Sequence, residues 1–178
     1  MSGSSPMQII KGYHCNDLEK TKNFIENKEL VMTSENGHWL GSGMYFWDNL
    51  SNAHYWKSEK IRKDPTKSYE VCIAFIGLDD TFLDLTDLDI ANKIQELWEE
   101  LAKEKKWDSK APLGLKLNLL YDAMPFFDVI KVSGSYPRAK KGNLIQYNPS
   151  KRCPQPTENS RIIYSVKSDK HIIATEVQ

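Results

Sequence analysis

The feature that most constrains the fold is the run Tyr69 to Ile76, with the sequence YEVCIAFI. This run is apolar, rich in residues that favour strands, and unbroken by Gly or Pro, as is typical of a strand buried on both faces. It therefore predicts a central strand of a sheet. Further strands are predicted at 8–14, 44–47, 81–85, 126–132, 161–166 and 171–177, with a short one at 144–147 inside a long loop.

Helical segments are interspersed with these strands. After Asp87, apolar residues recur at helical spacing and predict a helix to about residue 104. Helices are also predicted at 17–27, with Asn16 or Asp17 as the N-cap, at 51–60, with Ser51 as the N-cap, and at 113–124. This order of elements predicts an α+β fold in which the strands outnumber the helices.

The chain has the length of one domain, since it contains 178 residues. We expect a disordered tail at 1–7 and a single domain over 8–178. The opening residues lack the apolar core of a signal peptide, and no apolar run approaches the about 20 residues of a membrane span. The three cysteines form no CxxC motif, which fits reduced thiols. These features predict a cytoplasmic protein that does not enter a membrane.

Charge is balanced overall but uneven along the chain, with 24 basic and 24 acidic residues. The segment 131–170 holds only two acids, Glu158 and Asp169, among nine basic residues: Lys131, Arg138, Lys140, Lys141, Lys151, Arg152, Arg161, Lys167 and Lys170. Such a segment is either an ordinary solvated surface or a surface that binds phosphates.

Several common kinds of site are excluded by the motifs that the sequence lacks. The sequence contains no GxSxG, no GxxxxGK[ST] and no HExxH. The four histidines are scattered, without partners at metal-ligand spacing, so we expect no metal. Gly41-Ser-Gly43 has no third glycine and precedes a strand, which argues against a dinucleotide-binding Rossmann fingerprint.

A different pattern occupies the first half of the chain. A strand ends in GYHC (12–15), HWLGSGMYFWD follows at 38–48, SNAHY at 51–55, and FLDLTD at 82–87. This order resembles the ADP-ribosyltransferases of the His-Tyr-Glu type, which include poly(ADP-ribose) polymerases and diphtheria toxin. It is most similar to bacterial toxin-like members with a YHG…WLGxGxYFW pattern. The resemblance covers residues 9 to 87 and implies a split β-sheet core with flanking helices.

The resemblance also implies an NAD site. His14 would bind a ribose hydroxyl, the backbone at Cys15 would hold the nicotinamide amide, and Tyr45 and Tyr55 would stack on the nicotinamide ring. Gly41 and Gly43 would allow the ligand to approach the backbone closely. Taken singly, His14 would be a structural strand histidine and the two tyrosines would be core residues. Trp39, Trp47 and Trp56 are interpreted as core or rim packing.

The third catalytic residue is less well defined. The family places a Glu at the start of a late strand, where its carboxylate stabilises the transition state. Here RIIYSV aligns Ser160 or Arg161 with that position, and Glu158 lies two residues upstream of Ser160. Glu158 is either the catalytic carboxylate or a solvated loop acid. Gln146 and Glu176 are weaker alternatives.

These features together predict an NAD-dependent ADP-ribosyltransferase with His14, Tyr45 and Glu158 as catalytic residues. The resemblance implies a bacterial toxin, restrained by a cognate antitoxin, that modifies a protein or a nucleic acid. If the acceptor is nucleic acid, the basic residues at 138–152 would line its approach. The alternatives are an NAD glycohydrolase and an inactive binding module of the same fold.

Overall fold

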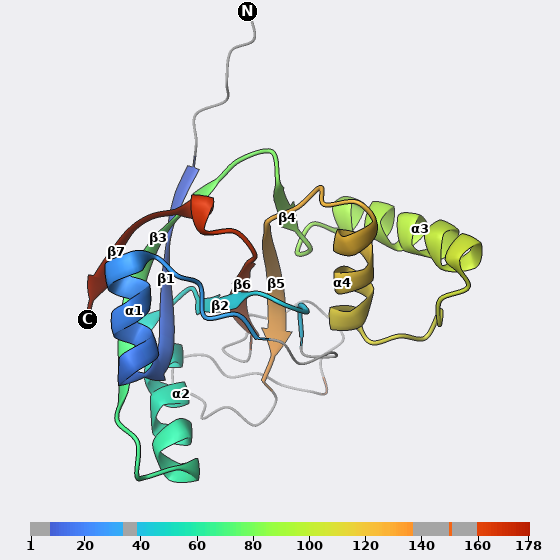
Figure 1. Cartoon of the computed structure of the whole chain (residues 1–178). Helices are drawn as coiled ribbons and strands as arrows, with labels where there is room; N and C mark the ends of the chain where they lie inside the picture. Colours follow the sequence, from blue (N-terminus) through green and yellow to red (C-terminus); the bar gives the residue numbers. More distant parts are fainter. Residues whose placement is uncertain (1–7, 34–38, 137–149, 151–159) are drawn as a thin grey trace, which may run out of the picture.

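The computed structural model describes residues 8–33, 39–136, 150 and 160–178 (Figure 1). Within these residues the chain forms a sheet of seven strands, four α-helices and a short 3-10 turn at Asp169–His171. The predicted α+β class is confirmed. The expected tail at 1–7, the strand at 144–147 and the basic residues at 138–152 lie outside the described residues.

The seven strands are ordered β4-β5-β6-β2-β1-β3-β7 across the sheet. The run that predicted a central strand lies in β3, which pairs on one side with β1 and on the other with β7. The strand bounds are β1 (Gln8–Asp17), β2 (Met44–Trp47), β3 (Tyr69–Leu78), β4 (Phe82–Asp84), β5 (Val129–Ser135), β6 (Ser160–Val166) and β7 (Ile172–Val177).

The sheet is nearly divided between β1 and β2. β1 pairs with β3 along ten residues, from Gln8↔Leu78 to Asp17↔Tyr69. It pairs with β2 at the single position Tyr13↔Trp47. Had this antiparallel ladder continued, Cys15 would face Tyr45. The two strands instead separate there, so an opening passes between two halves of one sheet.

Each helix begins at a side-chain cap or a proline. α1 (Leu18–Asn27) is capped by Asp17, and α3 (Leu88–Lys105) by Asp87, as the sequence predicts. α2 (Leu50–Lys63) is capped by Asn49, not by Ser51: the Asn49 side chain accepts a hydrogen bond from the backbone N–H of Asn52 at 3.0 Å. α4 (Leu113–Ala123) follows Pro112.

The helices cover different parts of the sheet (Figure 1). α1 packs on β1 and β3, where Phe24 enters a core that contains Phe46 and Val166 and so joins both halves of the sheet. α2 packs on the opposite face of β1 and β3, where Ala53 contacts Cys15 and Val71. α3 and α4 form a second core with β4 to β6, built around Trp98, Leu117, Leu120, Phe127, Ile130 and Ile163.

Two strands differ by three residues from the sequence-based expectation, and the other described strands differ by two residues or fewer at either end. β1 continues to Asp17 because its pairing with β3 persists to Tyr69. The strand expected at 126–132 is found at Val129–Ser135. Asp128 instead bonds back to Thr81, its backbone N–H lying 2.9 Å from the Thr81 carbonyl oxygen, and pairing with β6 continues as far as Ser135.

Candidate functional site

A cavity of about 580 Å³ lies where β1 and β2 separate. Its lining comes from both faces of the sheet, because His14 and Cys15 are adjacent strand residues and point to opposite faces. α1, α2 and β6 complete the wall. The principal lining residues are His14, Cys15, Asn16, Lys20, Thr33, Trp39, Tyr45, Trp47, Trp56, Lys60 and Ile163.

His14 bridges the opening with its side chain. Its Nδ1 lies 2.6 Å from the carbonyl oxygen of Tyr45, and because a carbonyl only accepts, Nδ1 carries the hydrogen. Nε2 is then an acceptor and lies 3.4 Å from the Asn16 side-chain nitrogen. A side-chain bond therefore joins β1 to β2 at the point where the backbone ladder has stopped.

The His14 imidazole is neutral near pH 7. Burial lowers its pKa to about 4, and the positive charge of Lys60 adds to this effect. The neutral ring carries its lone pair on Nε2, and this lone pair can accept a hydrogen bond from a ligand hydroxyl in place of the long contact with Asn16.

The depressed pKa of His14 predicts how stability depends on pH. Its ordinary value is 6.5, so between pH 6.5 and about 4 the unfolded chain binds a proton that the folded chain does not. The free energy of unfolding should therefore fall as the pH falls through this range, by at most about 3 kcal/mol at about 1.4 kcal/mol per pKa unit. Urea unfolding at several pH values measures this loss, and His14→Gln should reduce it. An unchanged slope in the variant would contradict the prediction.

Tyr45 is held by the loop that precedes it. Its hydroxyl donates to the Gly41 carbonyl oxygen at 2.6 Å and accepts from the Leu40 backbone N–H at 3.0 Å. Burial raises the pKa of the phenol. With the hydroxyl engaged by the loop, Tyr45 offers the cavity its ring rather than an acid or a base.

The two glycines are required by packing within the protein. Gly41 has a φ of +74°, and a Cβ there would collide with the Asn118 side chain on α4. A Cβ on Gly43 would collide with the Ser165 side chain on β6. The expectation that these glycines make room for a ligand therefore needs correction, because neighbouring protein atoms already fill the space, and Gly43 is not among the cavity-lining residues.

The aromatic wall differs from the sequence-based expectation. Trp39, Trp47 and Trp56, which were interpreted as packing residues, all line the cavity. Trp47 and Trp56 are stacked, with ring centroids 6.0 Å apart. Tyr55 is 58% exposed and is not among the lining residues. The sequence-based expectation missed Trp56. The signal that could have identified it is its spacing from Lys60, because residues four apart share one helix face, and both residues line the cavity.

Cys15 lines the cavity as expected but is not an activated thiol. Burial raises its pKa, and the opposing fields of Lys60 and Lys57 do not reverse that shift. Burial also raises the pKa of Cys72, which pairs with His14 across the two strands, to about 12. The φ of Cys15 is not positive, so a side chain at this position imposes no backbone strain.

The described lining of the cavity carries positive charge. Lys20 and Lys60 line it, and none of its described residues is Asp or Glu. Lys20 is partly neutralised by Asp17, 3.4 Å away, and Lys60 lies over the Tyr69 ring at 5.7 Å. The Lys20 side chain remains 59% exposed, and the charge of the described lining favours an anionic ligand.

The expected third catalytic residue is not settled by the described residues. Glu158 and Gln146 lie outside them. Ser160 is exposed and its hydroxyl contacts that of Ser133. Arg161 lies two residues before Ile163 and so shares the face of β6 that reaches the cavity. Glu176 is exposed on β7, which β3 separates from β1.

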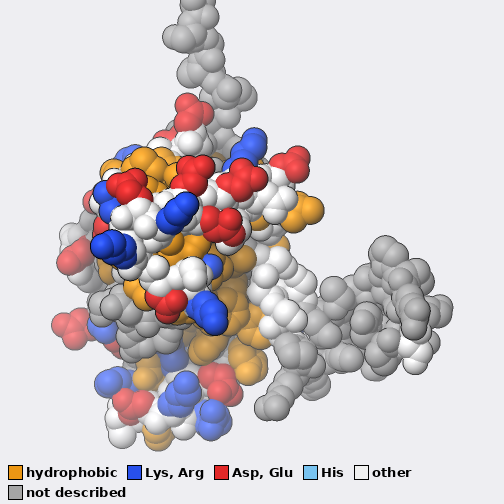
Figure 2. All heavy atoms as spheres, turned by 90° about the vertical axis from the view of Figure 1, so that its right-hand side faces the viewer, with side chains coloured by type: hydrophobic (Ala, Val, Ile, Leu, Met, Phe, Trp, Pro, Cys, Tyr) orange, Lys and Arg blue, Asp and Glu red, His pale blue; other side chains and the backbone are white. Residues whose placement is uncertain are grey.

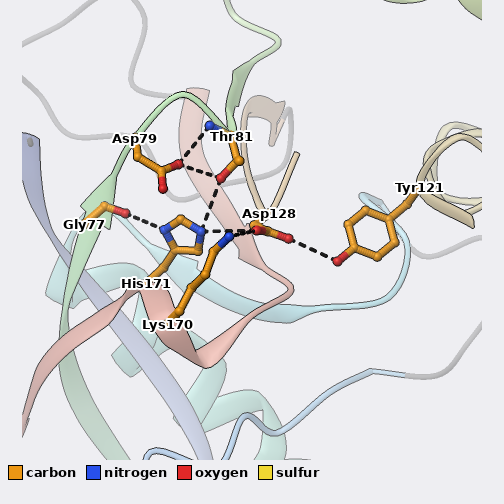
Figure 3. A network of polar contacts seen from close by, with 7 residues as sticks. All are labelled: Gly77, Asp79, Thr81, Tyr121, Asp128, Lys170 and His171. Carbon is orange, nitrogen blue, oxygen red and sulfur yellow. Dashed lines mark hydrogen bonds and ion pairs between the residues drawn. The ribbon is translucent and has the colours of Figure 1, made fainter. Parts of the chain in front are cut away.

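A second buried polar network lies at the other end of β3 (Figure 3). His171 Nδ1 donates to the Gly77 carbonyl oxygen at 2.9 Å, and its Nε2 lies 3.5 Å from Asp128. Asp128 also accepts from the Tyr121 hydroxyl at 3.0 Å and pairs with Lys170 at 2.5 Å. Burial opposes ionisation of Asp128, but the bonds from Lys170 and Tyr121 hold its pKa below the ordinary value. This network ties β3, α4 and the last turn together.

The described residues contain no group of three or more His, Cys, Asp or Glu side chains that could hold a metal ion. In the same part of the chain, no helix has both the length and the apolar character needed to cross a membrane.

Comparison with known proteins gives a partial match. No family model and no solved structure matches the chain. An uncharacterized protein of Methanocaldococcus jannaschii is 29% identical over 80 residues. That stretch is 43% of this chain and 37% of the archaeal protein, so the match spans well under half of that relative's length.

Proposed function

We propose that the chain is an NAD-dependent ADP-ribosyltransferase. The observation that carries this proposal is the opening between β1 and β2, where His14, Cys15 and Tyr45 meet around one cavity. These residues come from the two sequence segments that resemble the family. A sheet joined across this opening by one residue pair supports the family's split-sheet fold.

The cavity offers a partner for each part of NAD. Nε2 of His14 accepts a hydrogen bond from a ribose hydroxyl, and backbone groups near Cys15 bind the nicotinamide amide. The rings of Tyr45 and Trp56 provide apolar surfaces for the nicotinamide ring, and such stacking contributes about 0.5–1.5 kcal/mol beyond burial. Lys20 and Lys60 bind the pyrophosphate. In this arrangement Trp56 takes the role first expected of Tyr55, and Gly43 shapes the loop rather than contacting the ligand.

Transfer also needs a group that stabilises positive charge on the ribose. We propose Glu158 for this role, because it lies two residues before the start of β6, near the position that the resemblance assigns to the family's Glu. The described residues that line the cavity include no carboxylate, and this favours a second candidate function, an inactive module that binds NAD without turning it over. An NAD glycohydrolase, which passes the ADP-ribose to water, differs from the transferase only in its acceptor.

One experiment separates these functions. The protein should bind NAD and nicotinamide at millimolar concentration or below, as measured by calorimetry. Incubation with NAD labelled in the adenosine part and a cell lysate should then place label on macromolecules. Free ADP-ribose alone would indicate a glycohydrolase, and binding without turnover would indicate the inactive module. If neither NAD nor nicotinamide binds, the proposal is wrong.

The biological role that we propose is a cytoplasmic bacterial toxin with a cognate antitoxin. Its support is the resemblance to toxin-like members of the family. Induced expression in a bacterium should arrest growth, as colony counts would measure. Normal growth while the intact protein accumulates would count against the toxin role.

A further inference from the structure

Five aromatic rings follow one another across the face that contains the cavity. The ring centroids of Trp39 and Tyr136 are 5.5 Å apart, and those of Tyr136 and Trp47 are 6.1 Å apart. Trp47 then stacks on Trp56 at 6.0 Å, and Trp56 meets Tyr55 edge-on at 6.2 Å. We call these five residues the aromatic row.

The aromatic row extends beyond the cavity. Trp39, Trp47 and Trp56 line the cavity, whereas Tyr136 and Tyr55 do not. Two members of the row are well exposed, Trp39 at 44% and Tyr55 at 58%. Tyr136 lies between two rings that line the cavity, so the row continues past the cavity at its Tyr55 end. Exposed aromatic surface that continues past a binding site indicates a ligand longer than the one that fills the site.

Positive charge accompanies the row. Lys57 follows Trp56 directly on α2, Lys60 lies one turn further, and the charges of both act on Cys15 in the cavity. Beside the other part of the row, the charge of Arg161 acts on Tyr136. By contrast, Figure 2 shows acidic and basic side chains intermixed over the face that carries α3.

We propose that the aromatic row binds single-stranded nucleic acid. Proteins that bind single strands combine exposed aromatic rings, on which bases stack, with basic side chains that follow the phosphates. The row supplies the rings, and Lys57 and Lys60 supply the charges. A duplex hides the faces of its bases, so the row binds it less well. The lysines of this surface come from α2, and the proposal does not use the basic residues at 138–152 that the sequence first suggested, which lie outside the described residues.

The single-stranded nucleic acid would also be the acceptor of ADP-ribose. This acceptor role rests on the proposed function, whereas binding of the nucleic acid to the aromatic row does not. In the transfer, the bond between the ribose carbon and the nicotinamide nitrogen breaks. A bond forms from that carbon to an oxygen or nitrogen of the nucleic acid. Neutral nicotinamide leaves, and the acceptor releases one proton to solvent.

The binding test uses fluorescence anisotropy with labelled oligonucleotides of about ten nucleotides, within the usual range of site sizes. Single-stranded RNA and single-stranded DNA are titrated separately, beside a duplex of the same sequence. At least one single strand should bind, quench tryptophan fluorescence, and weaken steeply between about 50 and 200 mM salt. Equal affinity for the duplex, or no binding to either single strand, would overturn the proposal.

Variants locate the binding surface. Tyr55→Ala should weaken single-strand binding at least about fivefold, because one stacked base contributes that much or more. Lys57→Glu should weaken it by a similar factor at low salt and by less at high salt. Lys103→Glu makes the same charge change on α3 and should have no effect. Equal effects of the two lysine variants would show that only net charge matters and would overturn the proposed surface.

A parallel NAD titration distinguishes the two proposals. If NAD binds and single strands do not, the nucleic-acid inference fails and the proposed function stands. If single strands bind and NAD does not, the proposed function fails. If labelled NAD modifies proteins but no nucleic acid, the acceptor is a protein and the acceptor role assigned to the strand is wrong.

Discussion

Replacement of His14 by Ala is expected to abolish NAD binding while leaving the domain folded. The imidazole contributes the acceptor for a ribose hydroxyl, and it also satisfies the Tyr45 carbonyl oxygen at 2.6 Å. Without His14 the bound ribose hydroxyl is left unsatisfied, at a cost of about 1–3 kcal/mol, which lowers the affinity by roughly tenfold or more. A ligand bound at millimolar affinity would then escape detection. The orphaned Tyr45 carbonyl lowers the stability of the domain instead, in the free and the bound state alike.

The control for this variant is another histidine of the chain. His54 is exposed on α2 and is not among the cavity-lining residues, so His54→Ala should bind NAD as the unmodified chain does. Circular dichroism and thermal unfolding would establish that both variants are folded. If folded His14→Ala binds NAD with unchanged affinity, the ligand does not use this histidine and the proposed site is wrong.

A second large effect is expected from Glu158→Ala, on turnover rather than on binding. If this carboxylate stabilises charge on the ribose, its removal should lower the rate of nicotinamide release by about 10²–10³-fold, as for other preorganised electrostatic groups. NAD affinity should change little, because the carboxylate acts mainly in the transition state. Single-turnover release of nicotinamide measures the rate directly.

Glu176→Ala is the matched control, because it removes the same charge from an exposed position on the edge strand β7. It should release nicotinamide at the unmodified rate. If Glu158→Ala releases nicotinamide at the wild-type rate, Glu158 has no catalytic role. If the unmodified chain binds NAD and shows no turnover, the inactive module becomes the better description.

Most of the secondary structure could be predicted from local chemistry. The apolar run in β3 and the helical spacing after Asp87 both act over a few residues, and both are confirmed. The N-cap of α2 could not be chosen in this way. Asn49 and Ser51 are both good caps, and the choice depends on which of them meets the free N–H groups after β2.

The site was predictable only in part, because its lining depends on contacts between distant segments. His14, Cys15 and Tyr45 are brought to one cavity as the sequence suggested. The sequence could not show why position 43 requires a glycine. Ser165, which leaves no room for a side chain there, lies far along the chain and meets Gly43 only when β2 and β6 pair. Trp56 and Tyr55 are adjacent in sequence, and the packing of α2 on β1 decides which of them reaches the cavity.

The separation of β1 from β2 has a consequence for ligand choice. Where β1 and β2 diverge, their backbone groups no longer bond to each other, and His14 engages one of them, the Tyr45 carbonyl oxygen. A primary amide carries both a donor and an acceptor, so it can substitute for a missing piece of backbone, whereas a carboxylate offers only acceptors. If the proposed NAD site is correct, we expect the divided sheet to bind nicotinamide in preference to nicotinic acid, a selectivity set by main-chain geometry and independent of the side chain at position 15.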